Sequence, residues 1–134
     1  MGIENSRRFR ALPVYATLAA YGREGYSEML QRQIGLARGI ARYIKESDHF
    51  VLLPSQPGVT IDQVMGRTYI IVLFRARDDV LNAALVQRIN ATRRLYVSGT
   101  QWGGKPAARF AVANWQVDVE RDLEIAKEVL QSVL

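Results

Sequence analysis

Hydrophobic residues in the first third of the chain follow two helical patterns that are separated by glycines. Residues 13–21 (PVYATLAAY) are apolar on every side and begin with Pro13, which suits a first helical turn because the N–H there has no helical partner. From residue 26 to 45 the apolar residues recur at the three-and-four spacing of one helical stripe. The pattern therefore predicts a short apolar helix, a break at Gly22 and Gly25 with Gly22 as the C-terminal cap, and a long amphipathic helix.

Two features of these helices indicate that other segments pack against them. Gly35 and Gly39 each cost about 1 kcal/mol of helix propensity relative to alanine, so we expect another element to approach closely there. The helix at residues 13–21 is apolar all round and requires cover on every side. We expect that cover to come from an upstream segment that this chain lacks.

Strand patterns alternate with helical patterns in the rest of the chain. Residues 68–74 (TYIIVLF) are apolar on both alternations, which is typical of a central strand that is covered on two faces. Further strands are predicted at residues 50–53, 95–102 and 107–114, and further helices at residues 80–93 and 119–133. Together they predict an α+β fold, in which an antiparallel sheet of three or four strands has helices on one face and a long connecting helix before it.

Turns and helix caps are indicated by their own residue types. Residues 103–106 (GGKP) form a strong turn signal, and residues 54–67 are predicted to be a loop because prolines and glycines interrupt them. Either Asp78 or Asp79 is expected to cap the helix that follows it, and Asp118 is expected to cap the last helix.

The composition is that of one globular domain. The chain has 134 residues, of which 49% are hydrophobic, and a formal net charge of +5. It has no cysteine, no secretory signal and no run of about 18 apolar residues, so we expect a cytoplasmic protein without a membrane partner. The positive charge would suit a polyanion, but we interpret this chain as the basic part of a larger protein whose acidic part lies elsewhere.

Few residues of the chain are suited to catalysis. His49 is the only histidine and adjoins a charged helix end, so a surface position is expected. The carboxylates that a metal site would then require resemble helix caps or solvated helix faces. Lys45, Lys105 and Lys127 lie in exposed contexts, whereas lysines that form Schiff bases are buried. We therefore predict no catalytic residue, no cofactor-binding residue and no metal site in this chain.

One arginine is distinguished by its position in the last predicted strand (AARFAVAN). Phe110 and Val112 fall on one face of that strand, and Arg109, Ala111 and Ala113 fall on the other. The bulky face is expected to meet the helices. On the opposite face the guanidinium can hold a carboxylate through two parallel hydrogen bonds, or it can form an ordinary surface salt bridge. The residues alone do not decide between these two roles.

Several short motifs occur along the chain in a defined order. They are residues 6–12 (SRRFRAL), 21–26 (YGREGY), 85–92 (LVQRINAT), 96–98 (YVS) with Thr100, and 109–114 (RFAVAN). In this order they resemble the pyridoxal-phosphate-dependent group II decarboxylases, which include the aromatic-L-amino-acid, tyrosine, histidine and glutamate decarboxylases. The likeness runs from residue 6 to the end of the chain and is closer to the aromatic-type enzymes than to the glutamate enzymes.

The resemblance implies the C-terminal region of a fold type I pyridoxal-phosphate transferase. Residues 1–24 would then be the end of the large domain or a linker helix, and residues 25–134 the C-terminal small domain with its connecting helix. The principal partner would be the missing large domain that binds the cofactor, and the intact enzyme would be a homo-oligomer. The loop at residues 54–67 is longer than the connection that the family has at this place.

The resemblance also implies a reaction, the decarboxylation of an amino acid with pyridoxal phosphate as cofactor. The family's cofactor lysine follows a histidine in the large domain, and no His-Lys pair occurs in this chain. We therefore expect no cofactor in this chain and no activity of the chain alone. Arg109 matches the arginine that in some members reaches the substrate carboxylate or the surroundings of the cofactor, which makes it the expected carboxylate-binding residue.

Two further functions are compatible with the pattern of elements. From residue 68 onward, the order strand, helix, strand, strand, helix also fits a free-standing ferredoxin-like module that binds a ligand or RNA. The segment AARFAVAN lacks the glycine and the further aromatics of the RNA-binding pattern, so we expect no nucleic-acid partner. The other alternative is a non-catalytic dimerisation partner that retains the family's surface.

Overall fold

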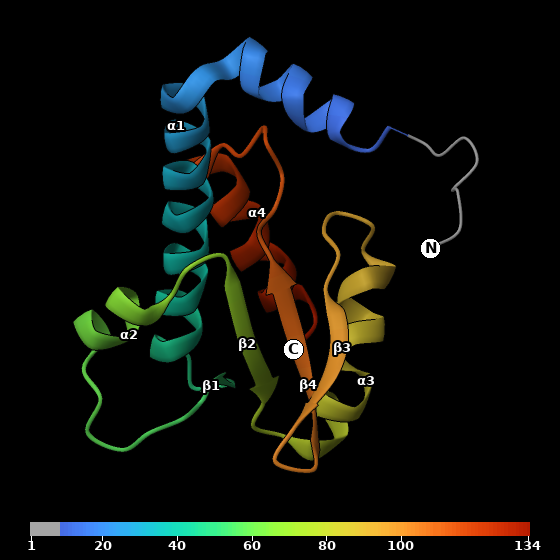
Figure 1. Ribbon diagram of the computed structural model, residues 1–134. Coiled ribbons are helices and arrows are strands. Elements are labelled where there is room, and N and C mark those ends of the chain that lie inside the picture. The colour runs from blue at the N-terminus through green and yellow to red at the C-terminus, as the bar shows by residue number, and fades with distance from the viewer. Residues whose placement is uncertain (1–8) are drawn as a thin grey trace, which may run out of the picture.

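A four-stranded antiparallel sheet lies at the centre of the structure, a computed structural model that describes residues 9–134 (Figure 1). Its strands, in spatial order, are β1 (Phe50–Leu53), β2 (Ile71–Ala76), β4 (Lys105–Ala111) and β3 (Ser98–Trp102). Each strand is antiparallel to its neighbours. The predicted α+β class, the antiparallel sheet and the central place of the strand within residues 68–74 are confirmed.

The hydrophobic core lies on one face of this sheet. The Phe74 ring stacks on Phe110 with the ring centroids 5.4 Å apart, and it meets Phe50 edge-on at 5.9 Å. Most of its buried helical residues come from α1 (Ala11–Glu46), α3 (Asp79–Ala91) and α4 (Val119–Ser132). In Figure 1, α3 and α4 lie behind the strands. The predicted facing of Phe110 toward the helices is therefore confirmed.

Helix α1 consists of two arms that meet at a sharp bend at Gly22 (Figure 1). Gly22 has φ +61° and ψ −172°, a backbone conformation that favours glycine because it has no Cβ. The predicted break is therefore confirmed at Gly22, whereas Gly25 already lies within the second arm. Every residue from 11 to 20 on the first arm is exposed. The first three residues of the SRRFRAL motif lie outside the described part of the chain.

The second arm of α1 packs against α4 near its glycines. A Cβ added at Gly39 would lie 2.9 Å from Leu123 Cδ2, which is closer than side-chain carbons normally approach. A Cβ at Gly35 would lie 3.6 Å from Val119 Cγ2, an ordinary van der Waals distance. Close packing is thus confirmed at Gly39, while Gly35 is a looser contact.

The segment predicted as a loop at residues 54–67 contains a short helix, α2 (Ile61–Arg67), so that prediction was wrong in part. The side chain of Thr60 accepts a hydrogen bond from Gln63 N at 3.3 Å, and the side chain of Gln63 accepts one from Thr60 N at 3.0 Å. This reciprocal pair is a capping box, and its Thr-x-x-Gln spacing is visible in the sequence. Met65 in α2 is buried in the core.

The other element boundaries differ from the predicted ones by a few residues. β2 continues to Ala76, two residues beyond the predicted strand, so Arg75 lies in the sheet and not in a turn. β4 already begins at Lys105, which leaves Gly103 and Gly104 as the turn, with φ of +58° and +76°. β3 begins only at Ser98.

Both predicted aspartate caps are confirmed. Asp78 Oδ1 accepts from Leu81 N at 2.6 Å at the start of α3, and Asp118 Oδ1 accepts from Arg121 N at 3.1 Å at the start of α4. Within residues 9–134, no helix has the length and apolar character needed to cross a membrane.

Candidate functional site

The face of the sheet opposite the core carries the arginine that the sequence singled out. Strand pairing places Arg109 between Leu73 of β2 and Ser98 of β3, with all three side chains on this face. We call it the open face and define it by Val51, Leu53, Ile71, Leu73, Arg75, Ser98, Thr100, Trp102, Lys105, Ala107, Arg109 and Ala111. Arg109 and Ala111 are exposed while Phe110 is buried, which confirms the predicted facing of β4.

Arg109 is held at one end of its guanidinium. Its Nε donates a hydrogen bond to Ser98 Oγ at 3.0 Å. Among residues 9–134 no carboxylate forms an ion pair with Arg109. A guanidinium bound through Nε still presents its two terminal amino groups as a pair of parallel donors, the arrangement that matches a carboxylate. The geometry is therefore suited to binding a carboxylate from the open side of the sheet.

Arg75 is a second cation on the open face, and the sequence analysis missed it. Leu73 is paired with Arg109, and Arg75 lies one pleat further along β2 on the same side. Residues related in this diagonal way have Cα atoms about 7–8 Å apart, within reach of two long side chains. Arg75 is half-buried, and no carboxylate of the described residues pairs with it. Period-two alternation carried one residue past Phe74, from Leu73 to Arg75, would have found it.

Apolar side chains share the open face with these two arginines. Ile71 and Trp102 are 45% and 46% exposed, and Leu73 is half-buried. No aspartate, glutamate or histidine belongs to the open face as defined by its strand residues. The face can therefore bind and orient an anion that carries an apolar group, but its own residues include no general acid or base at neutral pH.

The remaining candidates from the sequence are dispersed over the surface. Lys105 Nζ lies 3.5 Å from Asp79 Oδ1, and Lys127 Nζ lies 3.3 Å from Glu124 Oε2. Lys45 and His49 are exposed. Within residues 9–134 no group of three histidine, aspartate or glutamate side chains is placed to hold a metal ion.

Comparisons with known proteins relate the chain to decarboxylases. No protein-family model matches it. It is 28% identical to the aromatic-L-amino-acid decarboxylase of Sus scrofa over 84% of this chain and 21% of that protein. It is 27% identical to the 3,4-dihydroxyphenylacetaldehyde synthase of Aedes aegypti over 97% of this chain and 23% of that protein. The crystal structure of Oryza sativa TDC with PLP and tryptamine superposes with a TM-score of 0.75 at 24% identity, covering 95% of this chain and 27% of that chain.

These matches identify the region that the chain represents. It corresponds to the C-terminal region of group II pyridoxal-phosphate-dependent decarboxylases. The chain spans about a quarter of the length of the decarboxylases that it matches. The fold expected from the resemblance, that of the decarboxylase C-terminal domain, is confirmed.

The three lysines of the chain differ in setting from lysines that attach pyridoxal phosphate. Enzymes that use the cofactor attach it to a lysine, which is activated in a desolvated setting. The three lysines of the chain are all at least partly exposed, and Lys105, the one that lies on the open face, has its Nζ 3.5 Å from Asp79 Oδ1.

Proposed function

We propose that the chain is the C-terminal part of a cytoplasmic pyridoxal-phosphate-dependent amino acid carboxy-lyase and has no activity alone. Residues 25–134 are its small domain with the connecting helix, and residues 1–24 are the end of the large domain or a linker helix. The observation that carries the proposal is the open face, where Arg109 is exposed and its Nε donates to Ser98 Oγ. The matches to decarboxylases over a quarter of their length support it.

In this proposal Arg109 binds the carboxylate of the amino acid substrate. Its terminal amino groups point away from the Ser98 hydrogen bond, so a carboxylate can approach end-on and accept two parallel bonds. Arg75 adds a second positive charge on the same face and strengthens the attraction for an anion. Ile71 lies one pleat from Leu73, the partner of Arg109, and offers apolar surface that suits an aromatic or aliphatic amino acid side chain.

The bend at Gly22 lies two residues before the end of the proposed first part, residues 1–24. Beyond it, the second arm of α1 enters the core through residues such as Leu36 and Ile40. Before it, the first arm exposes Leu12, Val14 and Leu18. We propose that the missing large domain, or a second copy of the chain in a homo-oligomer, covers this arm.

The test of the proposal compares the chain alone with a reconstituted enzyme. The purified chain is mixed with pyridoxal phosphate, and visible absorbance and carbon dioxide release from aromatic amino acids are followed. We expect no saturable turnover, because a lysine in the large domain must hold the cofactor. A hybrid in which this chain replaces the C-terminal region of Oryza sativa TDC is expected to decarboxylate. Saturable turnover by the chain alone would contradict the proposal, as would a folded hybrid that binds the cofactor but is inactive.

The RNA-binding alternative has no comparable support. Sheets that recognise single-stranded RNA stack two or three bases on aromatic side chains. Among the strand residues that define the open face, Trp102 is the only aromatic. We therefore do not propose nucleic acid as a partner.

A further inference from the structure

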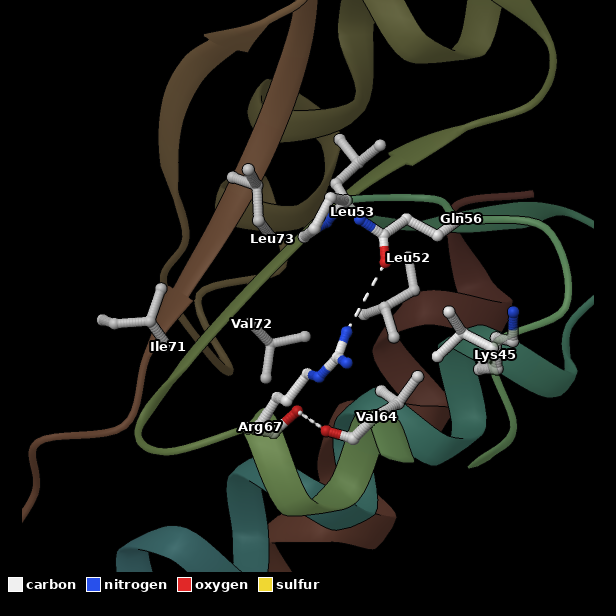
Figure 2. A pocket seen from close by; sticks show the side chains of 12 residues that line it. Lys45, Leu52, Leu53, Gln56, Val64, Arg67, Ile71, Val72 and Leu73 are labelled. Atoms are coloured by element: carbon white, nitrogen blue, oxygen red, sulfur yellow. Dashed lines mark hydrogen bonds between the residues drawn. The ribbon is translucent and has the colours of Figure 1, made fainter. Parts of the chain in front are cut away.

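A cavity of about 180 Å³ lies where the edge strand β1 ends (Figure 2). The last pair of the β1–β2 ladder is Leu53 with Leu73, so Val72 and Ile71 extend past the end of β1 without a partner on that side. The chain then passes through the 54–60 segment and α2. These two segments and the end of α1 enclose the space beside β2. The lining residues are Lys45, Leu52, Leu53, Pro54, Gln56, Val59, Val64, Arg67, Thr68, Ile71, Val72 and Leu73.

The polar groups of this cavity are cationic or neutral. Lys45 and Arg67 line it, and no aspartate or glutamate does. Figure 2 shows the Arg67 side chain reaching from α2 across the cavity, where Nη1 donates to Gln56 Oε1 at 3.5 Å. Among residues 9–134 neither Lys45 nor Arg67 forms an ion pair with a carboxylate. The cavity therefore carries positive charge that no acidic side chain of the described residues neutralises.

The walls of the cavity are aliphatic. Leu52, Val64 and Val72 are buried or half-buried and present hydrocarbon toward the space (Figure 2). The hydroxyl of Thr68 is already engaged, because it donates to Val64 O at 2.9 Å. A bound molecule would therefore contact mainly aliphatic side chains. Its polar contacts would be with Lys45, Arg67 and the side-chain amide of Gln56.

We propose that this cavity binds a small monocarboxylate with a short, branched aliphatic chain. The carboxylate would lie at Arg67 and Lys45, and the alkyl group would contact the aliphatic wall. The volume is below the roughly 300–1,000 Å³ of sites that bury drug-sized molecules, which limits the ligand to a few carbon atoms. Arg109 does not line the cavity, although Leu53, Ile71 and Leu73 belong to both the cavity and the open face, and the proposal does not rest on the proposed enzymatic function.

The test is a titration of the isotopically labelled chain, followed by backbone amide NMR. The probe is 4-methylpentanoate, and the controls are 4-methylpentanamide, which has the same shape without charge, and acetate, which has the charge without the alkyl chain. We expect saturable shifts at residues 54–60, in α2 and at the start of β2 with 4-methylpentanoate only. Absence of saturable shifts there would overturn the proposal. Equal binding of the amide or of acetate would also overturn it.

Matched substitutions separate the cavity from general positive charge. Arg67→Gln and Lys45→Gln are each expected to weaken binding about two- to fivefold, the range for one exposed ionic contact. Arg42→Gln removes an exposed arginine of α1 that does not line the cavity, and it is expected to leave binding unchanged. Val59→Phe should fill the space and abolish binding while the rest of the spectrum is retained. Equal weakening by Arg42→Gln and Arg67→Gln, or full binding by Val59→Phe, would contradict the assignment.

Discussion

Arg109 Nε donates to Ser98 Oγ at 3.0 Å between two paired residues of β4 and β3. The bond uses one of the five N–H donors of the guanidinium and leaves the four N–H donors of the two terminal amino groups. A serine can hold the arginine without neutralising it, which a carboxylate partner would do. The open face thus keeps a positioned, charged guanidinium available for a carboxylate.

Replacing Arg109 by lysine should affect substrate binding and not stability. Lysine keeps the charge but loses the planar fork that matches a carboxylate. In the hybrid decarboxylase we expect Arg109→Lys to raise KM about tenfold or more, since one hydrogen bond to a charged group contributes about 1.5–3 kcal/mol. In the chain alone, urea denaturation should show a change below about 0.5 kcal/mol in the free energy of unfolding.

Arg75→Lys is the matched control for that experiment. Arg75→Lys also replaces an arginine by a lysine on the open face, at the position of β2 that is diagonal to Arg109. If Arg109 binds the carboxylate and Arg75 contributes only its charge, Arg75→Lys should change KM much less. Equal effects of both substitutions, or no effect of Arg109→Lys, would leave Arg109 as a surface residue with no role in recognition.

The two glycines of α1 should respond differently to alanine. Gly35→Ala gains helix propensity and meets Val119 at an ordinary distance, so we expect the free energy of unfolding to rise by about 0.5–1 kcal/mol. Gly39→Ala gains the same propensity but places a methyl group 2.9 Å from Leu123 Cδ2, so the side chain must shift and the gain should be lost. Urea denaturation of both variants measures the difference. Equal stabilisation would mean that α4 is not closely packed at Gly39.

Asn82 is expected to be the polar residue that contributes most to stability. It is buried in α3, where Oδ1 accepts from Ala76 N at 3.0 Å and Nδ2 donates to Pro106 O at 3.0 Å. Asn82→Ala leaves the buried amide of Ala76 unpaired, so we expect a loss of about 1–3 kcal/mol in the free energy of unfolding. Asn114→Ala removes a bond to the exposed amide of Gln116 and should cost clearly less. Similar losses in thermal or urea denaturation would contradict this.

Local patterns were sufficient to predict much of the fold. Alternation placed Phe110 inside and Arg109 outside, and the aspartates before α3 and α4 act as caps because that chemistry is local. The bend at Gly22 was also predictable, since a positive φ favours glycine.

The features that were missed depend on contacts between segments distant in sequence. The charged residues at positions 75–79 indicate a turn, and the sequence pattern therefore places Arg75 outside the strand. In the structure, pairing with β1 extends β2 through Arg75. Asn82 lies on an apolar helical stripe, and only its bonds to β2 and to Pro106 explain it. Helix α2 was missed although its capping box was visible, because seven residues give little periodicity. The cavity beside α2 follows from the difference in length between β1 and β2, which no local pattern records.

The first arm of α1 is expected to make the chain associate with itself. Leu12, Val14, Tyr15 and Leu18 are each at least half exposed on this arm. Contiguous apolar patches of more than a few hundred Å² are rare on monomers, and pairing two such arms in a symmetric dimer would bury them. Sedimentation at high protein concentration should therefore show a dimer.

Leu18→Glu tests that association because it places a charge within the apolar patch while glutamate retains helix propensity. We expect it to shift the chain to monomer. Val80→Glu makes the same change at a residue of α3 that is 79% exposed, and it should leave the dimer intact. If the unaltered chain is a monomer while the first arm remains protected from hydrogen exchange, the arm folds back onto its own chain. If Val80→Glu dissociates the dimer as strongly as Leu18→Glu, charge repulsion and not the apolar arm determines association.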